Sequence, residues 1–401
     1  MPWKENSPTQ SRTQFIEDLH AGRGSFAEIC RRYGIARSTG YIWRDRHRTE
    51  GLAGLQPRRC GRAPGATERR RSKWHESFVA LRRKHPSWGP KKLRVFLQRQ
   101  KPGAKLPSER TIARLLLKAS LVRRRKQRQR AGPELVAVMT SARSCNAVWT
   151  LDFKGHFFTG DGRKCLPLTI RDLFSRYLLC TEHVDQPSER AVRKVMTRCF
   201  RQYGLPRVIR VDNGAPFAGV GPLQLSTLSV WWLRLGIRVE FTRRGKPQDN
   251  GAHEQMHRIL KQIVAKPPSA TLQQQKRRLA RFRHEYNQER PHESLGQKTP
   301  ASVYRPSQTH YQQPGELKYG NQWAVRIVSC NGYIRWKGRV RLVGRAFARQ
   351  RIGLKSARAR TPVEESSVVK VHLGNLLIGE LHDADPAGMR GARWQRRKPG
   401  S

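Results

Sequence analysis

Acidic side chains are scarce in this chain, which has 29 Asp and Glu residues against 81 Lys and Arg residues and a formal charge of +52. A charge of this density favours polyanions as partners through counterion release, with binding that falls steeply as salt rises. Long apolar runs are also missing: no segment approaches the roughly 18–20 residues needed to cross a bilayer, and no signal-peptide apolar region follows Met1. Composition therefore predicts a soluble, intracellular protein that binds a polyanion.

The seven cysteines are scattered, and no two form a Cys-x-x-Cys pair. An odd, dispersed set in a chain of this length indicates reduced thiols in a cytosolic compartment. At 401 residues the chain exceeds one ordinary domain, and roughly two to four domains are expected. Nearly half of the acids, 13 of 29, fall between residues 147 and 306, so this stretch differs in character from the rest.

Three of the scarce acids lie at the ends of predicted strands or at the start of a predicted helix, where a negative charge in so basic a chain needs an explanation. Asp152 follows the apolar run 148–151, and Asp212 follows a second run at 208–211. Glu254 opens a predicted helix just after a flexible, glycine-containing stretch. An acid on a nucleic-acid-binding face weakens the attraction unless it holds a cation that touches the phosphate. Because two strand-end carboxylates and one helix carboxylate can converge at one edge of a sheet, we predict a metal site there.

The chemistry of such a site would be phosphoryl transfer. Mg²⁺ and Mn²⁺ prefer oxygen ligands and keep positions for water and substrate phosphates. Two ions about 3.5–4 Å apart can activate the attacking oxygen and stabilise the leaving oxygen of an in-line displacement. One face of the predicted helix is apolar and carries Met256, Ile259, Leu260 and Ile263. The opposite stripe would place Glu254 beside two phosphate-binding cations, Arg258 and Lys261.

The first part of the chain, residues 11–56, predicts a helix-turn-helix unit. A Ser-x-x-Glu capping box begins at Ser25, and Gly34 can make the turn. Ser38 is placed to cap a second, basic helix, which would enter the major groove. The side chains of this helix that we expect on DNA are Arg37, Thr39, Tyr41 and Arg44. An ordinary helical hairpin is the alternative that the spacing leaves open.

A second and more weakly marked helix-turn-helix is predicted at 68–122. Pro90 suits the first turn of one helix, and the segment from Pro107 begins another, from which Arg110 would contact DNA. The basic segment 123–146 that follows contains a run with no apolar face. It can serve as a solvated linker or as an arm that holds phosphates through Arg124 and Arg125, and a flexible arm can do both.

Residues 147–306 predict a mixed α/β domain with helices on both faces of its sheet. Three early strands suit a meander, and the later strand–helix–strand passages suit parallel additions. The expected strands are 147–153, 165–171, 177–182, 207–211 and 237–242. The expected helices are 188–203, 222–235, 252–265 and 271–287.

The last part of the chain alternates apolar and polar residues, which is typical of strands. Segments 332–336, 339–343 and 368–373 carry this pattern, and Gly374-Asn375 suits a tight hairpin turn. We therefore predict a small all-β barrel at 315–382, followed by a basic, disordered tail at 386–401. The predicted fold class is multidomain: α-helical helix-turn-helix units, a mixed α/β core and a terminal β-barrel.

Several motifs occur in order within residues 147–306. They are WTLDFKGH at 149–156, DLFSR at 172–176, VDNGAPF at 211–217 and KPQDNGAHE at 246–254. A closing segment contains Tyr286-Asn287, Arg290-Pro291-His292, Leu295, Pro300-Ala301 and Tyr304. In these motifs the chain resembles the integrase-type (Asp-Asp-Glu) transposases of bacterial insertion sequences, whose catalytic core is similar to that of retroviral integrases.

The resemblance implies a ribonuclease H-like fold with a catalytic triad of Asp152, Asp212 and Glu254 that also binds two Mg²⁺ or Mn²⁺ ions. The interval from Asp212 to Glu254, 254 − 212 = 42 residues, is somewhat longer than the shortest family pattern, and an insertion around 219–235 would absorb it. No His-His-Cys-Cys zinc module of the retroviral kind is present at the N-terminus. Helix-turn-helix units take its place.

The resemblance also implies an activity, partners and a compartment. The chain would bind transposon ends, hydrolyse the 3′ ends and join them to target DNA, with Lys246 among the residues that hold the double-stranded DNA. Bringing two ends together requires at least a homodimer. The expected location is the bacterial cytoplasm, associated with the nucleoid, with no membrane partner.

Other functions stay open on the sequence alone. One is a metal-dependent nuclease without strand transfer. Another is a catalytically inactive or domesticated copy that acts as a sequence-specific DNA-binding protein. A general basic RNA-binding protein fits the composition but not the ordered acids.

Individual residues also have plainer interpretations. Asp172 and Asp249 would support local turns, and His156, His253 and His257 would be solvated or structural. A covalent role for Tyr286 is rejected, because no supporting Arg/His set is evident.

Overall fold

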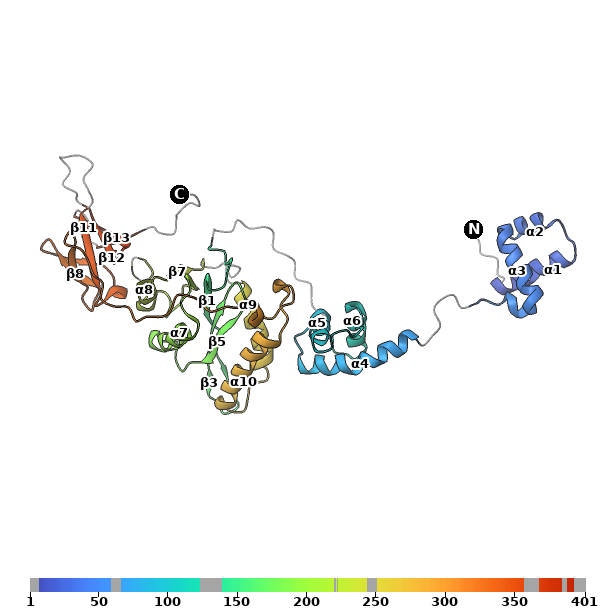
Figure 1. The fold of residues 1–401 in the computed structure, drawn as a ribbon, viewed down its shortest axis with the longest axis horizontal. Helices are drawn as coiled ribbons and strands as arrows, with labels where there is room; N and C mark the ends of the chain where they lie inside the picture. The colour runs from blue at the N-terminus through green and yellow to red at the C-terminus, as the bar shows by residue number, and fades with distance from the viewer. Residues whose placement is uncertain are drawn as a thin grey trace, which may run out of the picture. The chain divides into compact units, whose positions relative to one another are not determined.

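The computed structural model describes residues 7–58, 66–122, 139–219, 221, 223–243, 251–356, 368–383 and 388–392, and only the backbone of 66–72. The chain separates into two compact units, Met1–Lys73 and Trp74–Ser401. Figure 1 labels many of their elements. Among the described helices, none has both the length and the apolar character needed to cross a membrane.

The first unit is a three-helix arrangement around a small core. It contains α1 (Pro8–His20), α2 (Phe26–Arg32), α3 (Arg37–Glu50) and a 3-10 segment (Gly51–Leu55). The buried core is formed by Phe15, Ile16, Ile29, Cys30 and Leu55. Helices α2 and α3 flank the turn at Gly34, whose φ of 66° suits glycine. The predicted helix-turn-helix is present in this unit.

The two capping predictions for this unit have different outcomes. The Ser25 capping box is confirmed, because its side chain accepts from the backbone N–H of Glu28 and the Glu28 side chain accepts from Ser25 N–H. The prediction that Ser38 caps α3 is wrong. The helix begins at Arg37 with Ala36 as N-cap, so Ser38 lies inside the first turn. Ala36 makes no side-chain cap bond there.

The second helical group contains α4 (Ala66–Lys84), α5 (Pro90–Gln100) and α6 (Glu109–Lys118). Pro90 occupies the first turn of α5, as predicted. Ser108 caps α6 by accepting from Thr111 N–H. The helices enclose the apolar side chains of Trp74, Phe78, Trp88, Leu93, Leu97, Ile112 and Leu116.

The central sheet has five strands in the order β5-β4-β1-β6-β7. Its strands are β1 (Val148–Phe153), β4 (Pro167–Asp172), β5 (Leu178–His183), β6 (Val208–Val211) and β7 (Arg238–Phe241). Strands β1, β4 and β5 pair antiparallel, whereas β6 and β7 add in parallel. The predicted meander with parallel additions is therefore confirmed. A small hairpin, β2 (Phe157–Phe158) with β3 (Lys164–Cys165), follows β1.

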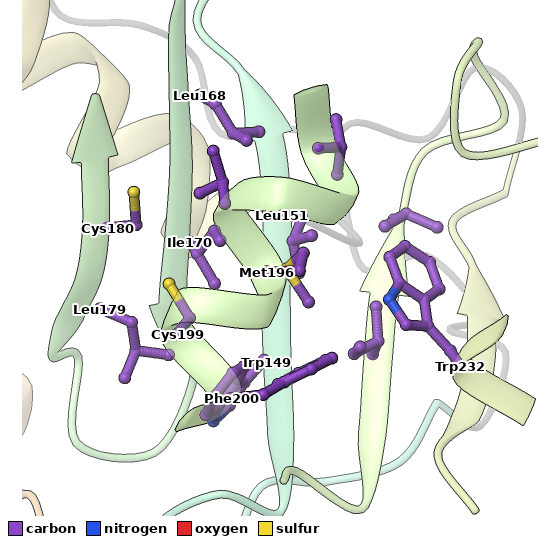
Figure 2. Close-up of a cluster of buried hydrophobic side chains, with 14 of the residues drawn as sticks. Trp149, Leu151, Leu168, Ile170, Leu179, Cys180, Met196, Cys199, Phe200 and Trp232 are labelled. Carbon is purple, nitrogen blue, oxygen red and sulfur yellow. The ribbon is translucent and has the colours of Figure 1, made fainter. Parts of the chain in front are cut away.

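Helices cover both faces of this sheet (Figure 1). Figure 2 shows side chains of α7 (Glu189–Tyr203) packed over Trp149 and Leu151 of β1. The neighbouring helix α8 (Thr227–Arg234) contributes Trp232 to the same cluster.

A separate apolar cluster includes side chains from the other two helices of the domain, Met256 and Leu260 of α9 and Leu279 and Phe282 of α10. The helix α9 (Gly251–Leu260) continues as a π-helical turn, Lys261–Ala265, and α10 (Leu272–His284) continues as another, Glu285–Glu289. A short α11 (Pro300–Val303) follows. Because side chains alternate along a strand, Thr150 and Asp152 face away from Trp149 and Leu151.

The last part of the chain forms open sheets. A five-stranded sheet has the order β14-β13-β12-β11-β8, and β9 (Tyr333–Trp336) pairs only with β10 (Arg339–Leu342) within the described ladders. The five strands are β8 (Ala324–Ile327), β11 (Arg351–Ser356), β12 (Val368–Leu373), β13 (Leu376–His382) and β14 (Arg390–Gly391).

The predicted closed β-barrel is not confirmed. A barrel requires its first and last strands to pair, and among the described strands β8 and β14 remain two separate edges. The predicted hairpin turn at Gly374 is present between β12 and β13, where Gly374 has a φ of 60°. Strand β14 lies in the stretch expected as a disordered tail, and it pairs with β13.

Candidate active site

Two of the three predicted carboxylates lie at the same edge of the central sheet. Asp152 is near the end of β1, and Asp212 comes directly after β6. The two strands are parallel neighbours, with Thr150 paired to Arg210. Continuing this register by two residues brings Asp152 level with Asp212. Strand pairing thus places both acids at adjacent strand ends, which is where ligands bind in open α/β sheets.

The third carboxylate, Glu254, is in the first turn of α9 and is exposed. Arg171 of β4 ties the start of this helix to the sheet, because its Nη1 donates to the backbone oxygen of Ala252 at 2.6 Å. Arg171 pairs with Thr150 in the β1–β4 ladder and is almost fully buried. A buried arginine on the neighbouring strand therefore brings the Glu254 helix to the end of β1.

Asp212 and Glu254 both lie within electrostatic reach of Asp152. Burial, together with repulsion from Asp212 and, more weakly, from Glu254, raises the pKa of Asp152 from 3.8 to about 7. Lys154 and a hydrogen bond from the Phe153 backbone oppose this shift. Clustered carboxylate oxygens that repel one another are the donor set that Mg²⁺ or Mn²⁺ prefers. The residues present therefore fit the ions that the predicted chemistry requires.

Two histidines on the inner face of α9 lie directly behind Asp152. The ring of His253 bonds to two hydroxyls, with Nδ1 at 2.8 Å from Thr150 Oγ1 and Nε2 at 2.7 Å from Thr169 Oγ1. His257 places Nε2 at 2.7 Å from the same Thr169 hydroxyl and Nδ1 at 3.5 Å from Asp152 Oδ2. Burial lowers the pKa of both rings, that of His257 to about 3, which favours their neutral forms.

The buried hydrogen bonds of both rings agree with the predicted structural interpretation of His253 and His257, and the same rings also belong to a candidate metal-binding group. Asp152, His253 and His257 each offer a ligand atom, and these atoms lie within 4.8 Å of one another. The available signal was the i, i+4 spacing of the two histidines, which places both on the buried face of α9 with Met256. His156, by contrast, is exposed, in agreement with its solvated interpretation.

The segment from His253 to His257 also matches the His-Glu-x-x-His sequence motif of zinc peptidases, in which both histidines bind the metal. The geometry here is different. Both ring nitrogens of His253 are engaged by threonine hydroxyls. Glu254 lies on the exposed side of the helix. The motif therefore does not indicate a peptidase site in this fold.

The residues that were expected to support turns do so where they are described. Asp172 is fully buried and accepts hydrogen bonds from the backbone of Asn146 and from both the backbone and the hydroxyl of Ser175. Asp249 lies outside the described residues. Tyr286 is 4% exposed, which agrees with the rejection of a nucleophilic role.

The residues predicted to contact DNA are on the surface wherever the structure describes them. Arg37, Tyr41, Arg44, Arg110, Arg258 and Lys261 are exposed, and Thr39 is half-buried. On α3, Tyr41 stacks on Phe26, and the Arg44 guanidinium lies 4.8 Å from the Tyr41 ring centre. Arg124, Arg125 and Lys246 lie outside the described residues. Contact with DNA remains a prediction for the whole set.

Comparison with known proteins gives the class of the chain. Residues 142–247 and 235–300 match models of the integrase core domain. Residues 11–64 match a helix-turn-helix domain, and 39–116 match a homeodomain-like domain. Over these residues the chain is similar to integrase core domains, and ahead of them it is similar to helix-turn-helix domains.

Particular relatives agree with this class. The chain is 26% identical over 226 residues to an uncharacterized 31.7 kDa protein of insertion element IS407 from Burkholderia multivorans, covering 56% of this chain and 78% of that protein. It is 28% identical over 246 residues to an uncharacterized 39.2 kDa protein of insertion element IS476 from Xanthomonas euvesicatoria, covering 58% and 66%. The predicted resemblance to integrase-type transposases of insertion sequences is confirmed.

Retroviral proteins are also similar. The Pol polyprotein of feline endogenous virus ECE1 is 30% identical over 122 residues, which is 29% of this chain and 11% of that protein. Among solved structures, the HTLV-2 integrase catalytic core domain in complex with magnesium has 15% identity and a TM-score of 0.33, covering 41% of this chain and 100% of that one.

Proposed function

We propose that this chain is a DNA transposase that binds the ends of its own element, hydrolyses their 3′ strands and joins the freed ends to target DNA. The observation that supports the proposal is the position of Asp152 and Asp212 at the ends of two paired parallel strands, with the Glu254 helix held to the same sheet by Arg171. A cluster of repelling carboxylates in a chain of charge +52 is explained if cations bind between the acids and DNA phosphates.

Different residues of the chain would bind the metal ions, hold the DNA and position the helix that carries Glu254. Asp152, Asp212 and Glu254 would hold two Mg²⁺ or Mn²⁺ ions, which supply charge stabilisation to the attacking and leaving oxygens. Arg258 and Lys261 follow Glu254 on the exposed side of the helix and would hold the DNA backbone. The buried anchor Arg171 would keep the Glu254 helix against the sheet.

The rest of the proposal concerns domains, assembly and compartment. Residues 147–306 would form the catalytic domain, and the units at 11–56 and 68–122 would recognise the element ends. The basic segment 123–146 would hold phosphates between them. Joining two ends at one target requires at least two copies of the chain. We place the reaction in the bacterial cytoplasm, at the nucleoid.

The test compares two site variants with a matched control. Asp152→Asn and Glu254→Gln remove a carboxylate charge with little change in shape, and Asp185→Asn does the same at an acid that is 91% exposed in the same domain. Both site variants should bind element ends as the wild type does and lose strand transfer by at least ~10³-fold, because residues of a catalytic unit are lost together. Gel shift and joining of labelled ends measure the two properties.

The outcomes separate the alternatives. Strand transfer that survives Asp152→Asn contradicts the metal-ligand assignment. Metal-dependent cleavage without joined products indicates a nuclease. End binding by the wild type with neither cleavage nor joining indicates the catalytically inactive or domesticated sequence-specific DNA-binding protein.

A further inference from the structure

The hydroxyl of Thr169 fixes the hydrogen positions of the network behind Asp152. Its Oγ1 donates to the backbone oxygen of Asp152 at 2.9 Å and lies 2.7 Å from Nε2 of both His253 and His257. A hydroxyl has one hydrogen and two lone pairs. Since the hydrogen goes to Asp152, both histidines must donate Nε2–H to Thr169. The same tautomer is thereby fixed on both rings.

The two histidines differ at Nδ1, which carries a lone pair in a neutral ring of this tautomer. Nδ1 of His253 accepts a hydrogen bond from the Thr150 hydroxyl at 2.8 Å. For Nδ1 of His257, the described residues provide no hydrogen bond. The polar atom beside it is Asp152 Oδ2, which is an acceptor when the carboxyl is ionised, and the His257 residue is only 7% exposed.

Two acceptor atoms that face each other need a positive species between them. The separation of His257 Nδ1 and Asp152 Oδ2 is 3.5 Å, longer than the roughly 2.7–3.2 Å of a hydrogen bond. Divalent ions bind such atoms at about 2.0–2.2 Å. Two neighbouring ligands of one ion then lie about 3.0–3.5 Å apart. The observed separation therefore suits a shared cation better than a shared proton.

We propose that His257 Nδ1 and Asp152 Oδ2 bind the same divalent cation, so that the metal site contains one nitrogen ligand besides the carboxylates. The inference rests on the proposed function, in which Asp152 is a metal ligand. His253 is not a ligand, because its lone pair already accepts from Thr150. An imidazole nitrogen favours first-row transition ions over Mg²⁺, so the site prefers a transition ion, for which Mn²⁺ is the probe.

The test measures Mn²⁺ binding by the full chain without DNA, using electron paramagnetic resonance to count free ions and its pulsed form to detect nitrogen bound to manganese. Two variants separate ligation from structural support. His257→Gln can keep a donor for Thr169 but loses the atom at the Nδ1 position. His257→Asn can keep an oxygen near that position but loses the Thr169 donor.

Ligation predicts that His257→Gln weakens Mn²⁺ binding at the Asp152 site by about tenfold or more and abolishes the nitrogen signal. The Asn variant should retain more affinity than the Gln variant, also without the nitrogen signal, and should bind Mg²⁺ more competitively. His156→Ala, at an exposed histidine near the same strand end, should change nothing. Circular dichroism confirms that each variant is folded.

The contrary results are distinct. A Gln variant that binds Mn²⁺ with the wild-type affinity and nitrogen signal overturns the role of His257, while loss of binding in Asp152→Asn still supports the proposed function. Wild-type Mn²⁺ affinity in Asp152→Asn overturns the metal assignment itself, and both proposals with it.

Discussion

At the scale of single residues, Asp152 is the side chain on which the site depends. It is partly buried, and two other carboxylates lie within electrostatic reach, so its charged form is disfavoured in the metal-free protein. A divalent cation bound there would offset this penalty by supplying the opposite charge. The free-energy penalty of ionising Asp152 in the folded protein is therefore a consequence of the metal-binding role that we propose for the site.

This cost gives a pH-dependent prediction for Asp152→Asn. Because the folded pKa is about 7 against 3.8 in the unfolded chain, the folded state binds more protons between these values, and its stability falls as pH rises through that window. The variant lacks the penalty. We expect its unfolding free energy, with chelator present, to exceed that of the wild type by a few kcal/mol at pH 8 and to approach it near pH 4.

Urea unfolding followed by tryptophan fluorescence from pH 4 to 8 measures the effect. Asp185→Asn, at an exposed acid, should show no comparable trend. A gain for Asp152→Asn that is constant across this range would mean that the charge at Asp152 is not the cause.

At the scale of elements, the junction between α9 and the sheet decides the geometry of the site. The Arg171 side chain fixes the start of the helix through Ala252, and the two histidines fix its first turns through Thr150 and Thr169. None of these contacts is between neighbours in the sequence. The helix can therefore present Glu254 outward while its inner face is held rigidly.

The helix-turn-helix elements give a second prediction, through their caps. Ser25→Ala should destabilise the first unit by about 0.5–2 kcal/mol, because it removes the acceptor for Glu28 N–H at the start of α2. Ser38→Ala should be close to neutral, since Ser38 is exposed and α3 begins before it.

Thermal unfolding of the full chain, followed by end binding in a gel shift, compares the two serine variants directly. An equal loss of stability in both would contradict the helix boundary at Arg37. A loss of end binding in Ser38→Ala without a loss of stability would instead indicate that this serine contacts DNA.

At the scale of the whole molecule, the excess of positive charge decides how DNA binding responds to salt. The excess of 81 basic over 29 acidic residues predicts that binding to element ends falls steeply with salt. A protein that contacts several phosphates loses about 10³–10⁵ in affinity between 50 and 200 mM salt. We expect a loss of this size, and fluorescence anisotropy with labelled end DNA measures it.

An unrelated duplex of the same length is the control. Its affinity should fall with a similar slope from a weaker starting value, because phosphate contacts position the protein and base contacts specify the sequence. A shallow slope for end DNA would contradict a binding mode based on phosphate contacts.

The sequence by itself determined the elements of the central domain and the positions of the three acids. The apolar runs that end at Asp152 and Asp212 predicted β1 and β6, because buried parallel strands need such runs. The capping box at Ser25 likewise fixed the start of α2, because its hydrogen bonds are local. These features depend on residues that are close in the chain.

Only the tertiary structure decided the roles of His253 and His257, the anchoring of α9 by Arg171 and the open form of the last sheet. The partners of each histidine lie on β1 and β4, 84 to 105 positions earlier. Whether a set of strands closes depends on pairing between its two edges, which no local pattern specifies. The partners in hydrogen bonds between distant segments are known only from the folded structure.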